Sequence, residues 1–164
     1  MKKRASKGTL THLDRGGRAR MVDVGDKPET VRTARVRGRI RMKKAALEAI
    51  RLHSVAKGDV LSVARIAGIM AAKRTAELVP LCHPLMLEDV QVDLVVDPAL
   101  PGIRVESAVR TTGRTGVEME AVVAATMALV TVYDMTKSLD REMEIGDISL
   151  VEKTGGRSGM YPAH

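Results

Sequence analysis

The residues best suited to proton transfer lie at the ends of one stretch, 115–137, which reads TGVEMEAVVAATMALVTVYDMTK. Asp134 and Lys137 close it, and on a helix their i, i+3 spacing puts the carboxylate and the ammonium on one face. A lysine whose protonation is set by a nearby carboxylate and by burial can act as a general acid or base. The apolar residues before the pair predict that it is buried. The alternative is an ordinary ion pair at a helix end, which contributes little to stability.

Two carboxylates, Glu118 and Glu120, open the same stretch. Acidic residues in a first helical turn complement the helix dipole, and this explanation is sufficient from the spacing alone. A carboxylate can also accept hydrogen bonds from the N–H groups of a guanine-like ring. Glu118 and Asp134 are 16 residues apart, which is about 24 Å at a rise of ~1.5 Å per residue. One small substrate would not reach both ends of such a helix. If both ends carry chemistry, we therefore expect each site to combine one end from one subunit with the other end from a second subunit.

Cys82 and His83 lie in a loop between two prolines, within VPLCHPL at 79–85. Adjacent side chains rarely face one another, so a catalytic pair competes with a buried thiol beside a loop histidine. One Cys and four scattered His lack the ligand spacing of a zinc site. The basic, glycine-rich tail from Lys153 to Gly159 can cradle phosphate through backbone N–H groups. It lacks the Walker A spacing, and taken alone a frayed terminus explains it better.

Composition narrows the class of protein. The 164 residues fit one domain, and the core must be aliphatic and Met-rich, because the chain has ten Met, two Tyr and no Phe or Trp. A formal charge of +7 indicates either anionic partners or a solvated basic surface. The near absence of aromatic residues disfavours RNA recognition by base stacking. The single Cys and the lack of an apolar leader predict a cytoplasmic protein with a reduced thiol.

Hydrophobic periodicity predicts the elements that position these residues. They are a strand at 34–42, helices at 43–53 and 60–78, a strand hairpin at 90–96 and 103–110, a helix over the apolar run 121–132 and a strand at 145–153. Asp59 is the expected N-cap of the second helix, Gly68 allows it to pack closely, and Pro80 ends it. The apolar run is too short to span a membrane. The first strand carries arginines at 35, 37, 39 and 41 on one face, which either bind phosphates or are solvated.

With the first two helices counted as one crossover, this order is the ferredoxin-like β-α-β-β-α-β arrangement. We expect an α+β fold in which helices cover one face of an antiparallel sheet, with an extra helix in the first crossover. The other sheet face then needs a cover or a partner. A single domain is expected at 21–159, between a flexible basic segment at 1–20 and a flexible tail at 160–164.

Eight segments, in this order, resemble the MoaC family, the cyclic pyranopterin monophosphate synthases of molybdenum cofactor biosynthesis. They are MVDV at 21–24, KGDV at 57–60, ARIAGI at 64–69, AAKRT at 71–75, LCHPL at 81–85, TGVEMEA at 115–121, YDM at 133–135 and KTGGRSG at 153–159. The resemblance covers residues 21–159. It implies a ferredoxin-like fold and a homohexamer built as a trimer of dimers.

The resemblance also implies an activity. Members of the family convert 3′,8-cyclo-7,8-dihydro-GTP, the product of an upstream radical GTP cyclase, to cyclic pyranopterin monophosphate and release pyrophosphate. This is a lyase-type reaction on a small-molecule substrate. No cofactor, metal, nucleic acid or membrane is implied.

Family positions can be carried over residue by residue. The catalytic positions fall on Asp134, Lys137, Lys153 and Lys57. The substrate-binding positions fall on Leu81, Cys82, His83, Glu118, Met119, Glu120 and Arg32. Arg157 stands where Lys is equally expected, and the arginine stripe of the first strand matches no family motif. Two alternatives remain open, a non-catalytic phosphate- or RNA-binding ferredoxin-like module and a structural oligomer subunit without a site.

Overall fold

The chain folds in the predicted order of strand, helices, strand hairpin, helix and strand. The structure is a computed structural model that describes residues 16–156 and 159–161. Its elements are β1 (Thr30–Arg41), α1 (Lys44–Arg51), α2 (Val60–Ala72), α3 (Thr75–Leu78), β2 (Asp89–Asp97), β3 (Gly102–Gly113), α4 (Glu118–Thr136) and β4 (Glu144–Thr154). The strands form one antiparallel sheet in the order β2-β3-β1-β4. This is the ferredoxin-like α+β fold, with an extra helix in the first crossover, and it confirms the predicted fold class.

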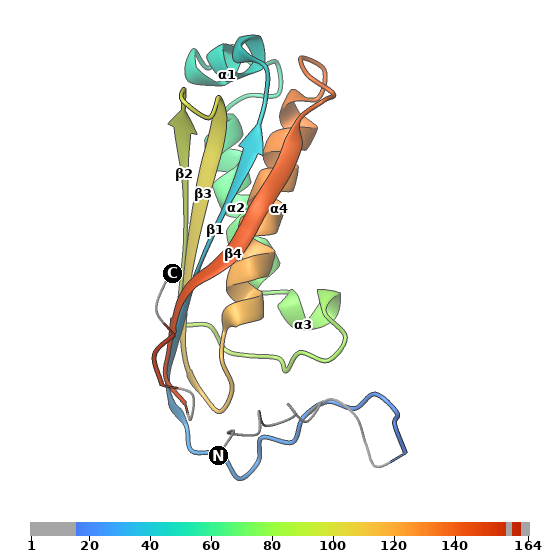
Figure 1. Ribbon diagram of the computed structural model, residues 1–164, viewed down its shortest axis with the longest axis vertical. Helices are drawn as coiled ribbons and strands as arrows, with labels where there is room; N and C mark the ends of the chain where they lie inside the picture. Colours follow the sequence, from blue (N-terminus) through green and yellow to red (C-terminus); the bar gives the residue numbers. More distant parts are fainter. Residues whose placement is uncertain (1–15, 157–158, 162–164) are drawn as a thin grey trace, which may run out of the picture.

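Two layers enclose the core. Figure 1 shows α2 and α4 lying side by side behind the sheet, with α1 beyond one end of the strands and α3 near the other. On β1 the alternate residues Ala34, Val36 and Ile40 are buried against the helices. On α4 the buried positions are mostly small: Ala121, Ala124, Ala125, Ala128, Leu129 and Val132. Small side chains let this helix lie close both to the sheet and to α2.

Gly68 sets the distance between α2 and α4. A Cβ atom at this position would lie 2.8 Å from the Ala124 carbonyl oxygen and 3.3 Å from the Ala128 Cβ. Real Cβ atoms do not approach a carbonyl oxygen so closely, so any larger residue would push the helices apart. The prediction that Gly68 permits close packing is confirmed.

The predicted helix at 60–78 is wrong in one respect, because it is broken near Arg74. Its start is as expected: the Asp59 side chain accepts from the Ser62 N–H at 3.1 Å. Arg74 then leaves helical geometry, with φ −113° and ψ 14°. The buried Thr75 hydroxyl donates to the Ala72 carbonyl at 2.9 Å and satisfies an acceptor that the helix end leaves open. The chain therefore restarts as the single turn α3.

α4 is longer than the apolar run that predicts it. At 19 residues it is, among the described residues, the one helix long and apolar enough to cross a membrane. Half of its most apolar 18-residue segment is buried inside the molecule. The core helices of soluble proteins can be equally long and apolar. Most of the predicted flexible segments fall on residues 1–15 and 162–164, outside the described residues, as does Arg157.

The open face of the sheet carries the arginine stripe of β1. Arg35 lies between two carboxylates, 3.5 Å from Glu106 and 3.0 Å from Glu152, and Arg39 is 2.6 Å from Asp147. Neighbouring strands therefore supply the counter-ions. Because two of the four arginines are already paired with carboxylates, this arrangement favours the solvated interpretation of the stripe over a phosphate site.

Candidate functional site

The first turn of α4 and the 79–85 loop line an open cavity of about 510 Å³. Its lining includes six predicted substrate-binding residues: Leu81, Cys82, His83, Glu118, Met119 and Glu120. Val22 and Val24 close one side, so the short apolar patch near the N-terminus docks on the body of the protein. Residues that are distant in sequence meet here because the fold places the loop beside the start of the helix.

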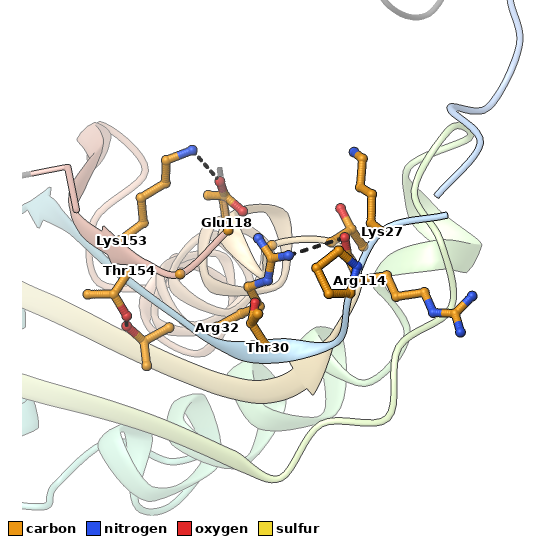
Figure 2. Close-up of a pocket in the computed structure, with 13 residues that line it drawn as sticks. Lys27, Thr30, Arg32, Arg114, Glu118, Lys153 and Thr154 are labelled. Atoms are coloured by element: carbon orange, nitrogen blue, oxygen red, sulfur yellow. Dashed lines mark hydrogen bonds and ion pairs between the residues drawn. The ribbon is translucent and has the colours of Figure 1, made fainter. Parts of the chain in front are cut away.

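A second cavity of about 450 Å³ adjoins the first. It contains Arg32 from β1 and Lys153 from β4, and Figure 2 shows Lys153 reaching the carboxylate of Glu118. That ion pair measures 2.7 Å. The Arg32 guanidinium donates to the carbonyls of Gly113 at 3.3 Å and Arg114 at 3.4 Å. These contacts come from three strands and the helix start, so the cavity depends on the complete fold.

The glycine-rich segment after β4 covers Arg32. Gly156 has φ +75°, and a Cβ atom there would collide with the Arg32 guanidinium. Glycine is therefore favoured by the backbone conformation, and a larger residue would also displace the Arg32 side chain. The result is a cation held between strand carbonyls and a glycine backbone.

Burial changes the acid–base properties of the first cavity. Glu120 is only 4% exposed, and this burial, together with the nearby Glu118 charge, raises the pKa of its carboxyl. Burial and the charge of Glu120 also raise the pKa of the Cys82 thiol. A thiol rather than a thiolate is therefore the form present at neutral pH, which disfavours a covalent role for Cys82.

The opposite end of α4 carries the second group of predicted residues. The Asp134 carboxylate accepts from Lys137 at 2.7 Å and from Lys57 at 2.8 Å. Hydrogen bonds from Lys137 and then from Lys57 lower the pKa of Asp134 to about 2. The same contact with Asp134 raises the pKa of Lys137. Both lysines therefore face an ionised carboxylate throughout the neutral range.

The predicted burial of the Asp134–Lys137 pair is wrong for the chain by itself. Both side chains are 54% exposed. Met135 and Thr136 of the same turn are buried, so Asp134 and Lys137 lie on the solvent side of a turn whose other side packs in the core. The pair is therefore open to solvent in one subunit.

The structure thus divides the predicted site residues into two groups. Lys57, Asp134 and Lys137 form one group at the C-terminal end of α4, and all the others gather around its N-terminal end. One chain does not bring the two groups together. Among the described residues, no cluster of three or more His, Cys, Asp or Glu side chains can hold a metal ion.

Two cationic residues of this region escaped the sequence-based prediction. Lys27 lines both cavities and Arg114 lines the second. Lys27 follows the MVDV segment by only three residues, so that motif could have drawn attention to it. Arg114 contacts the chain 89 residues away, at Gly25, and no local pattern indicates such a contact.

Comparison with known proteins places the chain in a family. Residues 21–156 match the model of the MoaC family. A protein of Methylobacterium nodulans is 59% identical over 155 residues, covering 94% of this chain and 97% of the relative. Proteins of Roseiflexus sp. and Brucella ovis are each 57% identical over 152 residues, covering 93% of this chain and 96% and 92% of the relatives. All three relatives are named cyclic pyranopterin monophosphate synthase. The chain belongs to the MoaC family.

Proposed function

We propose that this protein is a cyclic pyranopterin monophosphate synthase of molybdenum cofactor biosynthesis. Its substrate would be 3′,8-cyclo-7,8-dihydro-GTP, and its products cyclic pyranopterin monophosphate and pyrophosphate. The observation that carries the proposal is the near-complete match to relatives of that name. An upstream radical GTP cyclase as the source of substrate, and a cytoplasmic location, remain predictions.

The Lys57–Asp134–Lys137 group is proposed to transfer protons during rearrangement of the purine. Asp134 is an ionised acceptor between two ammonium groups, so it holds both lysines in place and keeps Lys137 protonated. Lys137 is then ready to act as a general acid. After it gives up its proton, the same amine can accept one in a later step.

The cavity that contains Arg32 and Lys153 is proposed to hold the phosphates. Formation of the cyclic phosphate requires a sugar hydroxyl to attack the α-phosphorus while pyrophosphate leaves. Negative charge then develops on the leaving oxygens, and fixed cations that face it lower the barrier. Arg32 is pre-oriented by two carbonyls, so it needs little reorganisation to stabilise this charge.

The buried carboxyl of Glu120 is proposed to recognise the guanine-derived ring. It lies with Cys82 and His83 in a cavity that is apolar on one side, where Val22, Val24 and Leu81 pack. A flat heterocycle fits such a site, because apolar walls bury its faces and a few polar groups pair with its edge.

An inter-subunit site would join the two groups of residues. Several large apolar side chains on the outer surface of the helical layer are exposed: Val63, Ile66 and Met70 of α2, Leu78 of α3, and Met119 and Val130 of α4. These side chains all belong to the helical layer, and exposed apolar surface that gathers into a patch is typical of a protein contact. A second copy that docks here could bring the Asp134 end of one chain to the Glu120 end of the other. We propose a homo-oligomer on this basis, with the hexamer implied by the family as the expected form.

The alternative of a non-catalytic RNA- or phosphate-binding module finds less support. RNA-binding sheets of this fold use aromatic residues on the open face, and none of the four strands contains one. Two arginines of β1 are already paired with carboxylates.

The direct test is turnover. Purified full-length protein should convert the cyclised GTP derivative to the cyclic pyranopterin, with one pyrophosphate released per product, measured by mass spectrometry and a coupled pyrophosphate assay. Asp134→Ala and Lys137→Ala should abolish turnover while circular dichroism and melting temperature stay close to wild type. A folded wild-type oligomer that yields neither product would overturn the proposed function, and polynucleotide binding would then be measured.

A further inference from the structure

Residues 23–29 form a turn that is fixed by its own hydrogen bonds. The Asp23 carboxylate accepts from the Gly25 N–H at 2.9 Å, and the Val24 carbonyl accepts from the Lys27 N–H at 3.1 Å. Such bonds hold a short loop in one conformation. The turn therefore fixes the backbone position from which the Lys27 side chain extends.

Arg114 ties this turn to the body of the protein. Its Nη1 atom donates to the Gly25 carbonyl at 2.8 Å, and its Nε atom lies 3.5 Å from the Glu29 carboxylate. The planar guanidinium can hold two acceptors in a fixed geometry, which an ammonium cannot do. In Figure 2 the Arg114 side chain points away from Arg32 and Glu118. The guanidinium therefore contacts the turn, whereas the Arg114 backbone carbonyl faces Arg32 in the second cavity.

Lys27 stands where the two cavities meet. Lys27, Thr115, Gly116 and Glu118 line both of them. Figure 2 shows Lys27 and Lys153 extending to the same side, with Arg32 between them. A ligand that occupies both cavities must therefore pass beside Lys27.

The charge of Lys27 is not neutralised locally. The side chain is half-buried, yet within residues 16–156 and 159–161 no carboxylate lies within ion-pair distance of Lys27 or of Arg32. Lys153, by contrast, already pairs with Glu118. Partly buried cations without a counter-ion favour an anionic ligand, because the ligand supplies the charge that the protein does not.

We infer that Lys27 is a binding residue for the phosphate chain of the substrate, and that Arg114 is the positioning residue that holds Lys27 at the junction of the two cavities. The inference deepens the proposed function and rests on it for the identity of the substrate. Its ligand class is an oligophosphate. The Lys27 ammonium makes a charge-assisted contact with it, and Arg114 acts only through the turn.

Kinetics of Lys27→Met test the binding role. A lost charge-assisted hydrogen bond costs about 1.5–3 kcal/mol, which corresponds to an increase of roughly tenfold to a hundredfold in KM. The kcat value should change by less than about threefold, because Lys27 is separate from the proton-transfer group. Lys44→Met, at an exposed lysine of α1, is the matched control and should leave both constants unchanged. An unchanged KM in folded Lys27→Met would overturn the role of Lys27.

The positioning role of Arg114 needs a second set of variants. Arg114→Gln should raise KM in the same direction but by less, and Arg114→Lys should recover part of the loss. In the double variant with Lys27→Met, KM should be no higher than in Lys27→Met alone, because Arg114 acts through Lys27. Arg110→Gln removes a comparably exposed arginine paired with Glu88 and should have no effect. Additive losses in the double variant would contradict the positioning role.

A binding assay separates this inference from the proposed function. Isothermal titration of the full-length protein with inorganic tripolyphosphate should give a Kd that rises at least about tenfold in Lys27→Met and that weakens with added salt. Lys27-dependent binding without turnover would sustain the anion site and reject the proposed reaction. If the wild-type protein turns over the substrate but Lys27→Met binds tripolyphosphate with wild-type affinity, the proposed reaction stands and the anion site is rejected.

Discussion

At the scale of single residues, the chemistry depends on how each carboxylate is surrounded. Asp134 is exposed and held by two lysines, so its pKa is low, whereas Glu120 is buried and its pKa is raised. The two carboxyls therefore have opposite tendencies to keep a proton. Two carboxyls whose surroundings push their pKa values apart are suited to different roles in one reaction.

The alkaline limb of the pH–rate profile tests the pairing of Asp134 and Lys137. Because Asp134 raises the pKa of Lys137, wild-type kcat should fall only when the pH rises through that elevated pKa. In Asp134→Asn the partner charge is lost, so the limb should move to lower pH and kcat should drop by about 10²-fold or more. The Asp134 pKa lies below its usual value, so the stability gained from its pairing is fully present above about pH 4. It is lost only as the pH falls through about 2. If the residual activity of Asp134→Asn falls at the same alkaline pH as the wild-type activity, Asp134 does not control the protonation of Lys137.

Glu120 should reduce the stability of the fold, although it is proposed to recognise the guanine-derived ring. A carboxyl whose pKa is raised on folding loses stability as the pH rises from its usual value through the raised one. Glu120→Gln should therefore raise the melting temperature at pH 8 but not at pH 4, by about 2–4 °C for each kcal/mol relieved. Turnover should fall, because an amide does not replace the carboxylate as a double acceptor. Glu144→Gln, at an exposed position of β4, is the control. A lower melting temperature for Glu120→Gln at both pH values would refute this account.

At the scale of elements, the packing of α2 on α4 positions both groups of site residues. Gly68→Ala places a methyl group against the Ala124 carbonyl. Helix propensity alone would make this change favourable by about 1 kcal/mol, but overpacking costs typically 1–3 kcal/mol. We expect net destabilisation in urea unfolding.

Gly146→Ala is the matched control for that measurement. A Cβ atom at this position would meet nothing within 4 Å, so the change in unfolding free energy should stay within about 0.5 kcal/mol. Stabilisation by Gly68→Ala would show that the helices tolerate separation. Gly68 would then not set their distance.

Local patterns were sufficient for the elements because burial on one face repeats along each of them. Alternation in β2 and β3 predicts the hairpin, and the small apolar residues of α4 predict a core helix. The break at Arg74 was missed, because it depends on a buried Thr75 hydroxyl that the local sequence does not reveal. The site was predicted mainly through resemblance. The sequence does not predict contacts such as that of Arg114 with Gly25, because only the folded chain brings these residues together.

At the scale of the whole molecule, the length of α4 separates Asp134 from Glu120 within one chain. The exposed apolar side chains of the helical layer support a second copy as the means of joining them. In a dimer with such sites, each site takes the Glu120 end from one subunit and the Asp134 end from the other. Two variants that are inactive alone can then form one intact site when combined.

The decisive measurement is therefore turnover by mixed oligomers of Glu120→Ala and Asp134→Ala, co-expressed with different tags and purified through both. The control pairs Asp134→Ala with Lys137→Ala, which damage the same end of α4 and leave no site intact. An inter-subunit site predicts that the first mixture regains product formation, up to one of the two sites in each mixed dimer, while the control stays inactive. Mixed oligomers that carry both tags and remain as inactive as the control would contradict a site built from two chains.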